Sequence, residues 1–396
     1  MENLQPFIFL IYSSYYPLFS NKNSNSSTNE RRRYMGSRYM GSRYMGRRTR
    51  RDMKKIVWIF TGGILFLLGL IILVFVIGDN GTRKNTNIDN INKFSIKPND
   101  IVFDTSNGGG PIIKVYIVKD KKIMEMFLEE YVRGVVAAEM PAGFSLEAIK
   151  AQAVASRTYA LAHMAKYGDQ KCTQGQGADI CDTVHCQAYM SKDERLNSWP
   201  EKTKGELWNK ITQAVISTEQ EVLTFNGKLV LAPYYFSTSS GRTENAIDIF
   251  NLDMPYLRSV QSNGEETSKK FTSIKKITYA ELAMKLNISY PKTGLTTAKI
   301  KSQIKILDRY EGGSVKNIKI GGLTITGVKF RSLFGLNSDN FTLEFSSKNV
   351  SVACKGYGHG VGMSQFGANA MGNIGKLYSE ILTHYYKNVK VEKMKY

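Results

Sequence analysis

The stretch VVAAEMPAGFSLEAIKAQAVASRTYALAH, residues 135–163, predicts a carboxylate at a break between two helices, and the other motifs can be placed around that pair. Pro141 has no backbone N–H and disfavours a helical residue before it, so the first helix should end near Glu139. Met140, Pro141 and Phe144 supply apolar surface around that carboxylate. Because desolvation disfavours the ionised form and raises a carboxyl pKa, Glu139 is a candidate general acid at neutral pH.

The second helix is predicted to begin after Ser145, a suitable N-cap, and to run to about Ala165, since its many alanines favour helix and close packing. Lys150 and Arg157 are seven residues apart, which places them on one face about 10 Å from each other at helical rise. Gln152 belongs to a neighbouring polar stripe. Two interpretations fit these polar residues: they form the solvated side of the helix, or they line a site.

Two further motifs follow in the second half of the chain. FSTSSGRTENA, residues 236–246, comes after short apolar strands and predicts a loop rich in hydroxyl groups. GYGHGVGMSQFGANAM, residues 356–371, has glycine at every second position from Gly356 to Gly362. In a strand this spacing leaves one face without side chains, so that backbone can approach a ligand closely. Met363 stands where a dinucleotide fingerprint needs a third glycine, and no βαβ unit follows.

These three motifs, in this order, resemble the stage II sporulation protein D family over about residues 112–391. The resemblance implies a membrane-anchored lytic transglycosylase of peptidoglycan, needed for engulfment in endospore-forming bacteria, and the amidase-enhancer proteins share its domain. The resemblance implies that Glu139 is catalytic. A lone histidine such as His359 is ordinarily a packing residue, although the resemblance favours a cleft role for it. The residues implied to contact or surround substrate are Lys150, Gln152, Arg157, Ser237, Ser239, Ser240, Gly358, His359, Gly360, Ser364 and Gln365.

The reaction implied by the resemblance needs fewer acids than hydrolysis. Hydrolysis of a glycoside ordinarily requires two carboxylates, and this neighbourhood offers one, Glu139. In a lytic transglycosylase the C6 hydroxyl of the muramic acid attacks its own C1 and leaves a 1,6-anhydro end at the MurNAc to GlcNAc bond. The resemblance also implies a preference for strands stripped of stem peptides, and two partners, the amidase stage II sporulation protein P and the membrane protein M. The alternative is a noncatalytic wall-binding or amidase-activating module, which would tolerate Glu139→Gln.

Three of the four cysteines lie within fifteen residues and share that stretch with a histidine: Cys172, Cys181, His185 and Cys186. Outside the membrane paired cysteines usually form a disulfide, yet three leave one over, and together with His185 they suit a tetrahedral zinc site. Adjacent His185 and Cys186 reach one ion only from an irregular turn. We expect structural zinc that the chemistry does not require, with a disulfide as the open alternative. Metal-dependent hydrolysis at this cluster would need a vacant zinc position.

The N-terminal part predicts membrane attachment. The chain has a net charge of +20, and residues 1–55 alone hold twelve Lys or Arg against three Asp or Glu. The same residues contain the repeated sequence RYMG. Residues 56–78 are uncharged and predominantly apolar, long enough to span a bilayer, with basic residues on their N-terminal side. Membrane topology therefore explains the basic cluster better than nucleic-acid binding does, and no nucleic-acid partner is expected. Residues 1–55 are either a cytoplasmic tail or an extension upstream of a start at Met53.

The predicted fold class is α+β, with a single-pass N-terminal membrane anchor followed by an extracytoplasmic domain of helices packed on antiparallel sheet around a substrate cleft. We expect residues 79–110 to form a stalk and residues 111–391 to form the catalytic domain. Residues 269–310 are predicted to be helical and Lys-rich, within a subdomain or insertion of about residues 265–310. Residues 315–345 are predicted to be alternating strands with a turn at Gly321 and Gly322. By resemblance, the anchor lies in the mother-cell membrane and the catalytic domain faces the intermembrane space.

Overall fold

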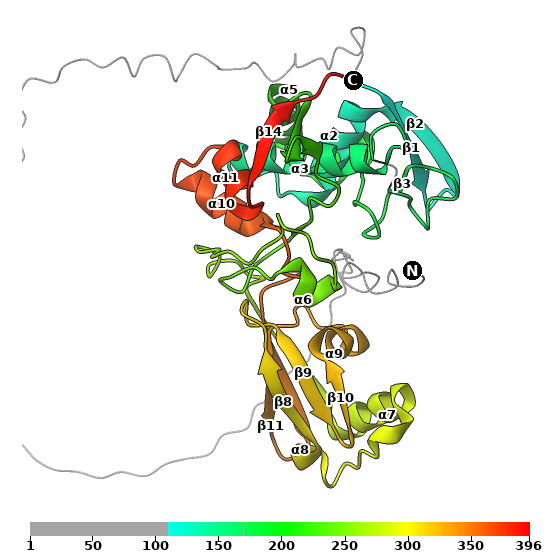
Figure 1. Cartoon of the computed structure of the whole chain (residues 1–396), viewed down its shortest axis with the longest axis vertical. Coiled ribbons are helices and arrows are strands. Elements are labelled where there is room, and N and C mark those ends of the chain that lie inside the picture. The colour runs from blue at the N-terminus through cyan, green and yellow to red at the C-terminus, as the bar shows by residue number, and fades with distance from the viewer. Residues whose placement is uncertain (1–109, 169) are drawn as a thin grey trace, which may run out of the picture. The chain divides into compact units, whose positions relative to one another are not determined.

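The computed structural model describes residues 110–168 and 170–396, and Figure 1 shows them in colour. The predicted tail, anchor and nearly all of the stalk lie outside the described residues. Among the residues that are described, no helix combines the length and the apolar composition needed to cross a bilayer. Helices and sheets are both present, and most strand pairs are antiparallel, so the predicted α+β class is confirmed.

A first hydrophobic core is built from both ends of the described chain, and α3 runs through it (Figure 1). Helix α3 packs against α2, α5, α10 and α11, and its alanines at 148, 151, 153, 155 and 160 are fully buried. Small side chains let four helices approach one helix closely, as the composition predicts. The helices of this part are α2 (Leu128–Glu139), α3 (Leu146–His163), α4 (Lys192–Ser198), α5 (Lys204–Ser217), α6 (Ala246–Phe250), α10 (Gln365–Asn373) and α11 (Tyr378–Tyr385).

Three small sheets border this core. One has the order β2-β1-β3, the second β14-β4-β5, and the third consists of β13 paired in parallel with β6. The last pair joins the two later sequence motifs, because Ser364 lies beside Phe236. The strands are β1 (Ile112–Ile117), β2 (Lys122–Phe127), β3 (Ile180–Cys181), β4 (Glu221–Phe225), β5 (Lys228–Leu229), β6 (Tyr235–Phe236), β13 (Met363–Ser364) and β14 (Val389–Lys393).

A second hydrophobic core is drawn from residues between Ile277 and Cys354, beyond the boundary of 310 suggested for an insertion. Residues 269–310 are not mainly helical, because β-branched residues at their two ends form strands β7 and β8. The turn at Gly321 and Gly322 is confirmed between β9 and β10. The elements are β7 (Thr272–Thr278), α7 (Tyr279–Ser289), η2 (Pro291–Thr293), α8 (Ile300–Gln303), β8 (Ile304–Arg309), β9 (Val315–Ile320), β10 (Leu323–Thr326), α9 (Gly327–Phe334), β11 (Phe341–Phe345) and β12 (Asn349–Lys355).

The glycine-rich segment is not the strand that its spacing predicted. Strand β12 ends at Lys355, and the alternate glycines Gly356, Gly358, Gly360 and Gly362 all have positive φ, between 79° and 119°. Each glycine therefore turns the chain, because L-residues with side chains rarely adopt that conformation. A Cβ at Gly362 would collide with the carbonyl oxygen of Tyr234. The close approach that the glycines permit is thus to the chain's own residues 234–244.

Candidate active site

Glu139 is the last residue of α2, where the helix break was predicted. Met140 is extended, with φ −105° and ψ 132°, and Ser145 caps α3 by accepting a hydrogen bond from the N–H of Ala148 at 3.2 Å. Both local predictions are confirmed. Pro141 thus ends one helix and Ser145 begins the next. The Glu139 side chain is left at the bend between two buried helices.

Two hydrogen bonds fix the carboxylate of Glu139. Its Oε1 accepts from the N–H of Ala188 at 3.1 Å, and its Oε2 accepts from Nε2 of Gln365, the first residue of α10, at 3.3 Å. Nε2 of Gln365 also lies 3.5 Å from Oε1 of Gln152, whose own Nε2 donates to Ser156 at 3.0 Å. The polar stripe on α3 therefore orients an amide that holds the carboxylate.

Burial raises the pKa of Glu139 to about 7, and the hydrogen bonds from Ala188 and Gln365 oppose that rise. The apolar side of the site is Met140 together with Phe144, whose ring meets Phe366 edge to face at 4.8 Å. The side chain of Glu139 is nevertheless only half-buried. A carboxyl that is partly protonated near neutral pH and still reachable from solvent has the properties of a general acid.

The predicted metal ligands come together beside this carboxylate. Three sulfur atoms surround Nδ1 of His185, with Sγ of Cys172, Cys181 and Cys186 at 3.6, 3.6 and 3.4 Å. The four ligand atoms all lie within 4.8 Å of one another. The turn after β3 is irregular, so adjacent His185 and Cys186 face one point. All four predicted residues, including the adjacent pair His185 and Cys186, are brought to one place.

The geometry of this Cys3His cluster fits a metal ion better than a disulfide. The Sγ atoms of Cys172 and Cys186 are 3.2 Å apart, whereas a disulfide requires about 2.05 Å. A tetrahedral zinc ion with ordinary bond lengths gives edges of about 3.5–3.8 Å between its ligand atoms. The three distances from Nδ1 of His185 to the sulfur atoms, 3.4–3.6 Å, are close to these edges. Nε2 of His185 lies 3.1 Å from Oγ1 of Thr173, an outer partner of the kind that orients a ligating imidazole.

Comparison with known proteins identifies the family. Residues 117–225 match the family model described as stage II sporulation protein. The chain is 37% identical over 297 residues to stage II sporulation protein D of Bacillus subtilis (strain 168), covering 75% of this chain and 83% of that protein. The chain belongs to the stage II sporulation protein D family. The Bacillus amyloliquefaciens member is 34% identical over 341 residues, covering 86% and 96% of the two chains. The amidase enhancer of B. subtilis is 28% identical over 303 residues, covering 64% and 39%.

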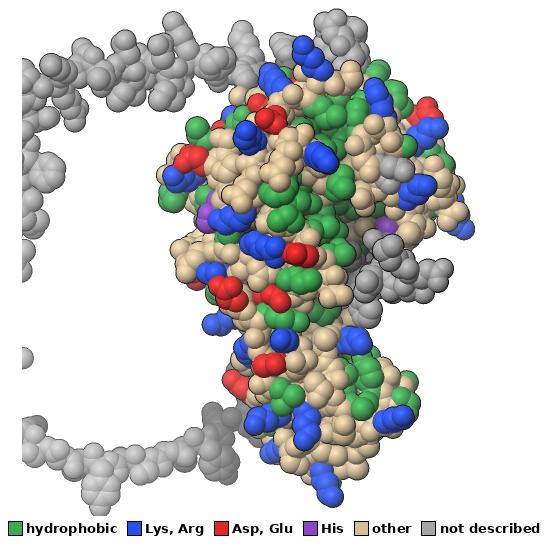
Figure 2. Space-filling model, viewed as in Figure 1, with side chains coloured by type: hydrophobic (Ala, Val, Ile, Leu, Met, Phe, Trp, Pro, Cys, Tyr) green, Lys and Arg blue, Asp and Glu red, His purple; other side chains and the backbone are tan. Residues whose placement is uncertain are grey.

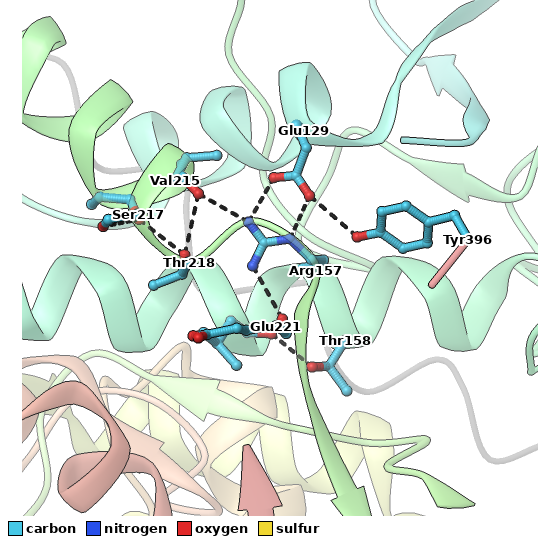
Figure 3. Close-up of polar contacts among 10 residues, drawn as sticks. Glu129, Arg157, Thr158, Val215, Ser217, Thr218, Glu221 and Tyr396 are labelled. Atoms are coloured by element: carbon cyan, nitrogen blue, oxygen red, sulfur yellow. Dashed lines mark hydrogen bonds and ion pairs between the residues drawn. The ribbon is translucent and has the colours of Figure 1, made fainter. Parts of the chain in front are cut away.

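In this member of the stage II sporulation protein D family, Arg157 is not placed to contact substrate, which corrects the prediction. Its guanidinium is fully buried and forms a two-pronged ion pair with Glu129 on α2, with both N–O distances 2.6 Å (Figure 3). It also donates to the carbonyl oxygens of Val215 and Glu221, and Tyr396 donates to Glu129 at 3.2 Å. A buried arginine with these partners ties α2 and α3 together.

Lys150 also lies away from the carboxylate. Its Nζ pairs with Glu147 at 2.8 Å and stands 5.6 Å from the centre of the Tyr378 ring, next to the start of α11. Residues two apart on a helix point to different sides, and Gln152 is the one that faces Gln365. The predicted substrate contact through Lys150 is therefore not supported by its position.

The predicted hydroxyl contacts are largely internal. Glu265 accepts hydrogen bonds from Ser364 Oγ at 2.6 Å and from the N–H of Ser239 at 2.8 Å. Ser237, Ser239 and Ser364 are buried, and Ser240 donates to the carbonyl oxygen of Gly312 at 3.3 Å. Ser237, Ser239 and Ser364 therefore support the backbone that leads into α10 and positions Gln365, whereas the half-buried Ser240 is bonded to Gly312.

His359 is a packing residue, the alternative to a cleft role that the sequence left open. Its Nε2 donates to the carbonyl oxygen of Tyr235 at 3.1 Å, and its Nδ1 accepts from the N–H of Val361 at 3.2 Å. Burial lowers its pKa to about 3, with a further contribution from the Arg331 charge, so the imidazole is neutral. Its neighbours Gly358 and Gly360 lie against Phe236 and Glu244, and a Cβ would clash at Gly358 and be tight at Gly360.

Proposed function

We propose that this protein is a lytic transglycosylase that cleaves the MurNAc to GlcNAc bond of peptidoglycan during sporulation. The observation that carries the proposal is Glu139, half-buried at a helix end, with a pKa of about 7 and with two donors that fix its orientation. Membership of the stage II sporulation protein D family supports the cellular setting. The predicted anchor and the predicted partners, the amidase protein P and protein M, belong to the same proposal.

The chemistry needs one carboxyl group in two protonation states. Protonated Glu139 gives its proton to the glycosidic oxygen as the bond from C1 of the muramic acid breaks. The C6 hydroxyl of the same sugar then bonds to C1, and the Glu139 carboxylate takes the hydroxyl proton. The acid is regenerated, and no water is consumed. Ala188 and Gln365 stabilise the carboxylate form between these steps, while burial favours the protonated form at the start.

We propose further that the Cys3His cluster holds structural zinc. The donor set and the separations of its atoms fit the ion, and a fourfold protein ligand set leaves no position for a reacting water. A bound zinc ion would cross-link the chain between residues 172 and 186. Ala188, two residues after Cys186, donates to Glu139, so an ordered turn here delivers one of the two donors at the carboxylate.

Purified glycan strands, treated with amidase and then incubated with the protein, test the proposal. The wild type should release fragments, Glu139→Gln should reduce the rate by at least about 10³-fold, and Glu130→Gln should leave the rate unchanged. Glu130 is an exposed glutamate of the same helix, so it controls for loss of negative charge. Equal cleavage by wild type and Glu139→Gln would refute the assignment.

An amidase-activating module is the second candidate, and the 28% identity to the amidase enhancer favours it. In that case the protein should accelerate a partner amidase on intact peptidoglycan, and Glu139→Gln should do so equally well. Stem-peptide release, measured with and without each variant, distinguishes this role from glycan cleavage.

A further inference from the structure

The positive charge of the described part is concentrated in one segment. Residues 269–355 contain sixteen Lys or Arg and five Asp or Glu, whereas residues 110–268 and 356–396 together contain twenty-two of each class. The part that carries Glu139 is therefore balanced, and the part built on the second core has a net charge of +11. A segment of this charge attracts polyanions.

Most of these cations are at the surface. Thirteen of the sixteen side chains are exposed, and Figure 2 shows Lys and Arg predominating over Asp and Glu on the visible face of this segment. Three of the five acids are paired or buried: Glu281 pairs with Lys285, Glu311 pairs with Arg242 outside the segment, and Asp339 is buried. Local charge neutralisation is accordingly incomplete.

The outer face of β8 and β9 shows this excess most clearly. Lys305 and Lys319 are directly opposite each other in the antiparallel register, and both are exposed. Leu307, at the irregularity where β8 departs from regular pairing with β9, is 50% exposed. Like charges directly opposite each other destabilise a sheet, so this pair lowers stability where a neutral pair would not. A ligand that places negative charge between the two ammonium groups would remove that repulsion.

The basic segment is connected to the active-site motifs at both of its ends. It lies in sequence between residues 236–246 and the segment that leads to Gln365. The N–H of Gly356 donates to Phe271 at 2.7 Å, and the N–H of Gly358 donates to Asn337 at 3.0 Å. Backbone hydrogen bonds thus join the second core to the glycine-rich segment.

We propose that the β8–β9 face around Lys305 and Lys319 binds the carboxylates of a peptide-stripped glycan strand. The inference rests on the proposed function, because a strand held at Glu139 is a polymer and continues beyond the cleavage site. When an amidase removes the stem peptide, each muramic acid keeps a lactyl carboxylate in place of a neutral amide. The stripped strand is therefore a regular polyanion, and a basic sheet face distinguishes it from a strand whose carboxylates are blocked.

Binding is measured with full-length Glu139→Gln protein in detergent, so that cleavage does not interfere. The probes are amidase-stripped strands and the same strands with their carboxylates converted to methylamides. Lys305→Gln/Lys319→Gln should weaken binding to stripped strands about tenfold and flatten its dependence on salt. The control Lys119→Gln/Lys202→Gln removes the same charge from exposed lysines outside the segment and should change binding less than about twofold.

Three results would overturn the proposal. The first is equal weakening by both double variants, and the second is equal binding of stripped and methylamidated strands. The third is that Lys305→Gln/Lys319→Gln weakens binding to anionic lipid vesicles but not to stripped strands. Misfolding does not confuse the test, because removing a like-charge pair should leave the melting temperature of Lys305→Gln/Lys319→Gln unchanged or raised. Wild-type cleavage is assayed separately. If the wild type cleaves no strand while the lysine variants still lose binding, the proposed reaction fails and the binding surface stands.

Discussion

Replacing Gln365 by leucine should raise the pKa of Glu139 and extend activity to higher pH. Nε2 of Gln365 donates to Oε2 of Glu139, and this hydrogen bond favours the ionised carboxylate. Leucine has a similar size and no donor, so the variant keeps the apolar surroundings and loses the stabilisation of the charge. Activity requires protonated Glu139 and is lost as pH rises through its pKa, so a raised pKa moves that loss upward.

The size of the shift follows from the contact. Hydrogen bonds to charged groups contribute about 1.5–3 kcal/mol, and the 3.3 Å separation places this one at or below the lower end. A value of about 1.4 kcal/mol corresponds to one pKa unit. The alkaline limb of kcat/KM should therefore move from near pH 7 to near pH 8, and the maximal rate should fall about tenfold because the carboxyl loses an orienting partner.

The assay is the pH profile of kcat/KM on amidase-stripped strands, for which the alkaline limb reports the free enzyme. Gln152→Leu is the graded control: it removes the acceptor that orients the Gln365 amide but keeps the donor itself, so its shift should be smaller and in the same direction. An alkaline limb that stays in place, or moves to lower pH, in Gln365→Leu would refute the role given to this hydrogen bond.

Three further predictions concern stability, measured by urea unfolding of the full-length protein. Arg157→Met leaves the buried carboxylate of Glu129 unpaired and should cost about 3–5 kcal/mol, and Glu129→Leu in the same chain should restore much of that loss; no recovery would contradict the pairing. Gly362→Ala should cost more than about 2 kcal/mol because its Cβ has no room, whereas Gly375→Ala, with similar φ and open space, should cost about 1 kcal/mol. Burial raises the pKa of Glu244 from 4.5 to about 7, so this group should contribute up to about 3 kcal/mol of stability that is lost as pH rises through that window. Glu244→Gln should remove that contribution, while the raised pKa of Glu139 leaves a fall of similar size in the variant. An unchanged pH dependence in the last variant would argue against burial of the charge.

The sequence predicted those features that depend on neighbouring residues. Pro141 and Ser145 act within one turn of themselves, so the end of α2 and the start of α3 could be placed from residue type alone. The Cys3His cluster was found because cysteine and histidine are rare in this chain and have few alternative uses outside the membrane. Gln152 and Gln365 were selected as site residues, although the structure shows them orienting Glu139.

The remaining features depend on distant partners. The polar face of α3 and the family resemblance predict a substrate contact for Arg157, and its ion-pair partner Glu129, 28 residues away on another helix, is not apparent from sequence. The alternate glycines have the same spacing in a strand and in a series of turns, and only their φ values tell the two apart. Ala188 contributes a backbone N–H, which residue identity does not reveal. Glu265 carries no motif, and its role became visible only when three donors were found around it.

Cleavage of amidase-stripped strands in oxygen-18 water tests the central claim, that Glu139 alone directs attack by the sugar's own hydroxyl group. Mass spectrometry of the new muramic acid ends should show 1,6-anhydro termini without oxygen-18 from the wild type, and none from Glu139→Gln. Reducing ends that carry one oxygen-18 atom would show that water attacks C1, and would contradict the account by requiring a second group to activate it.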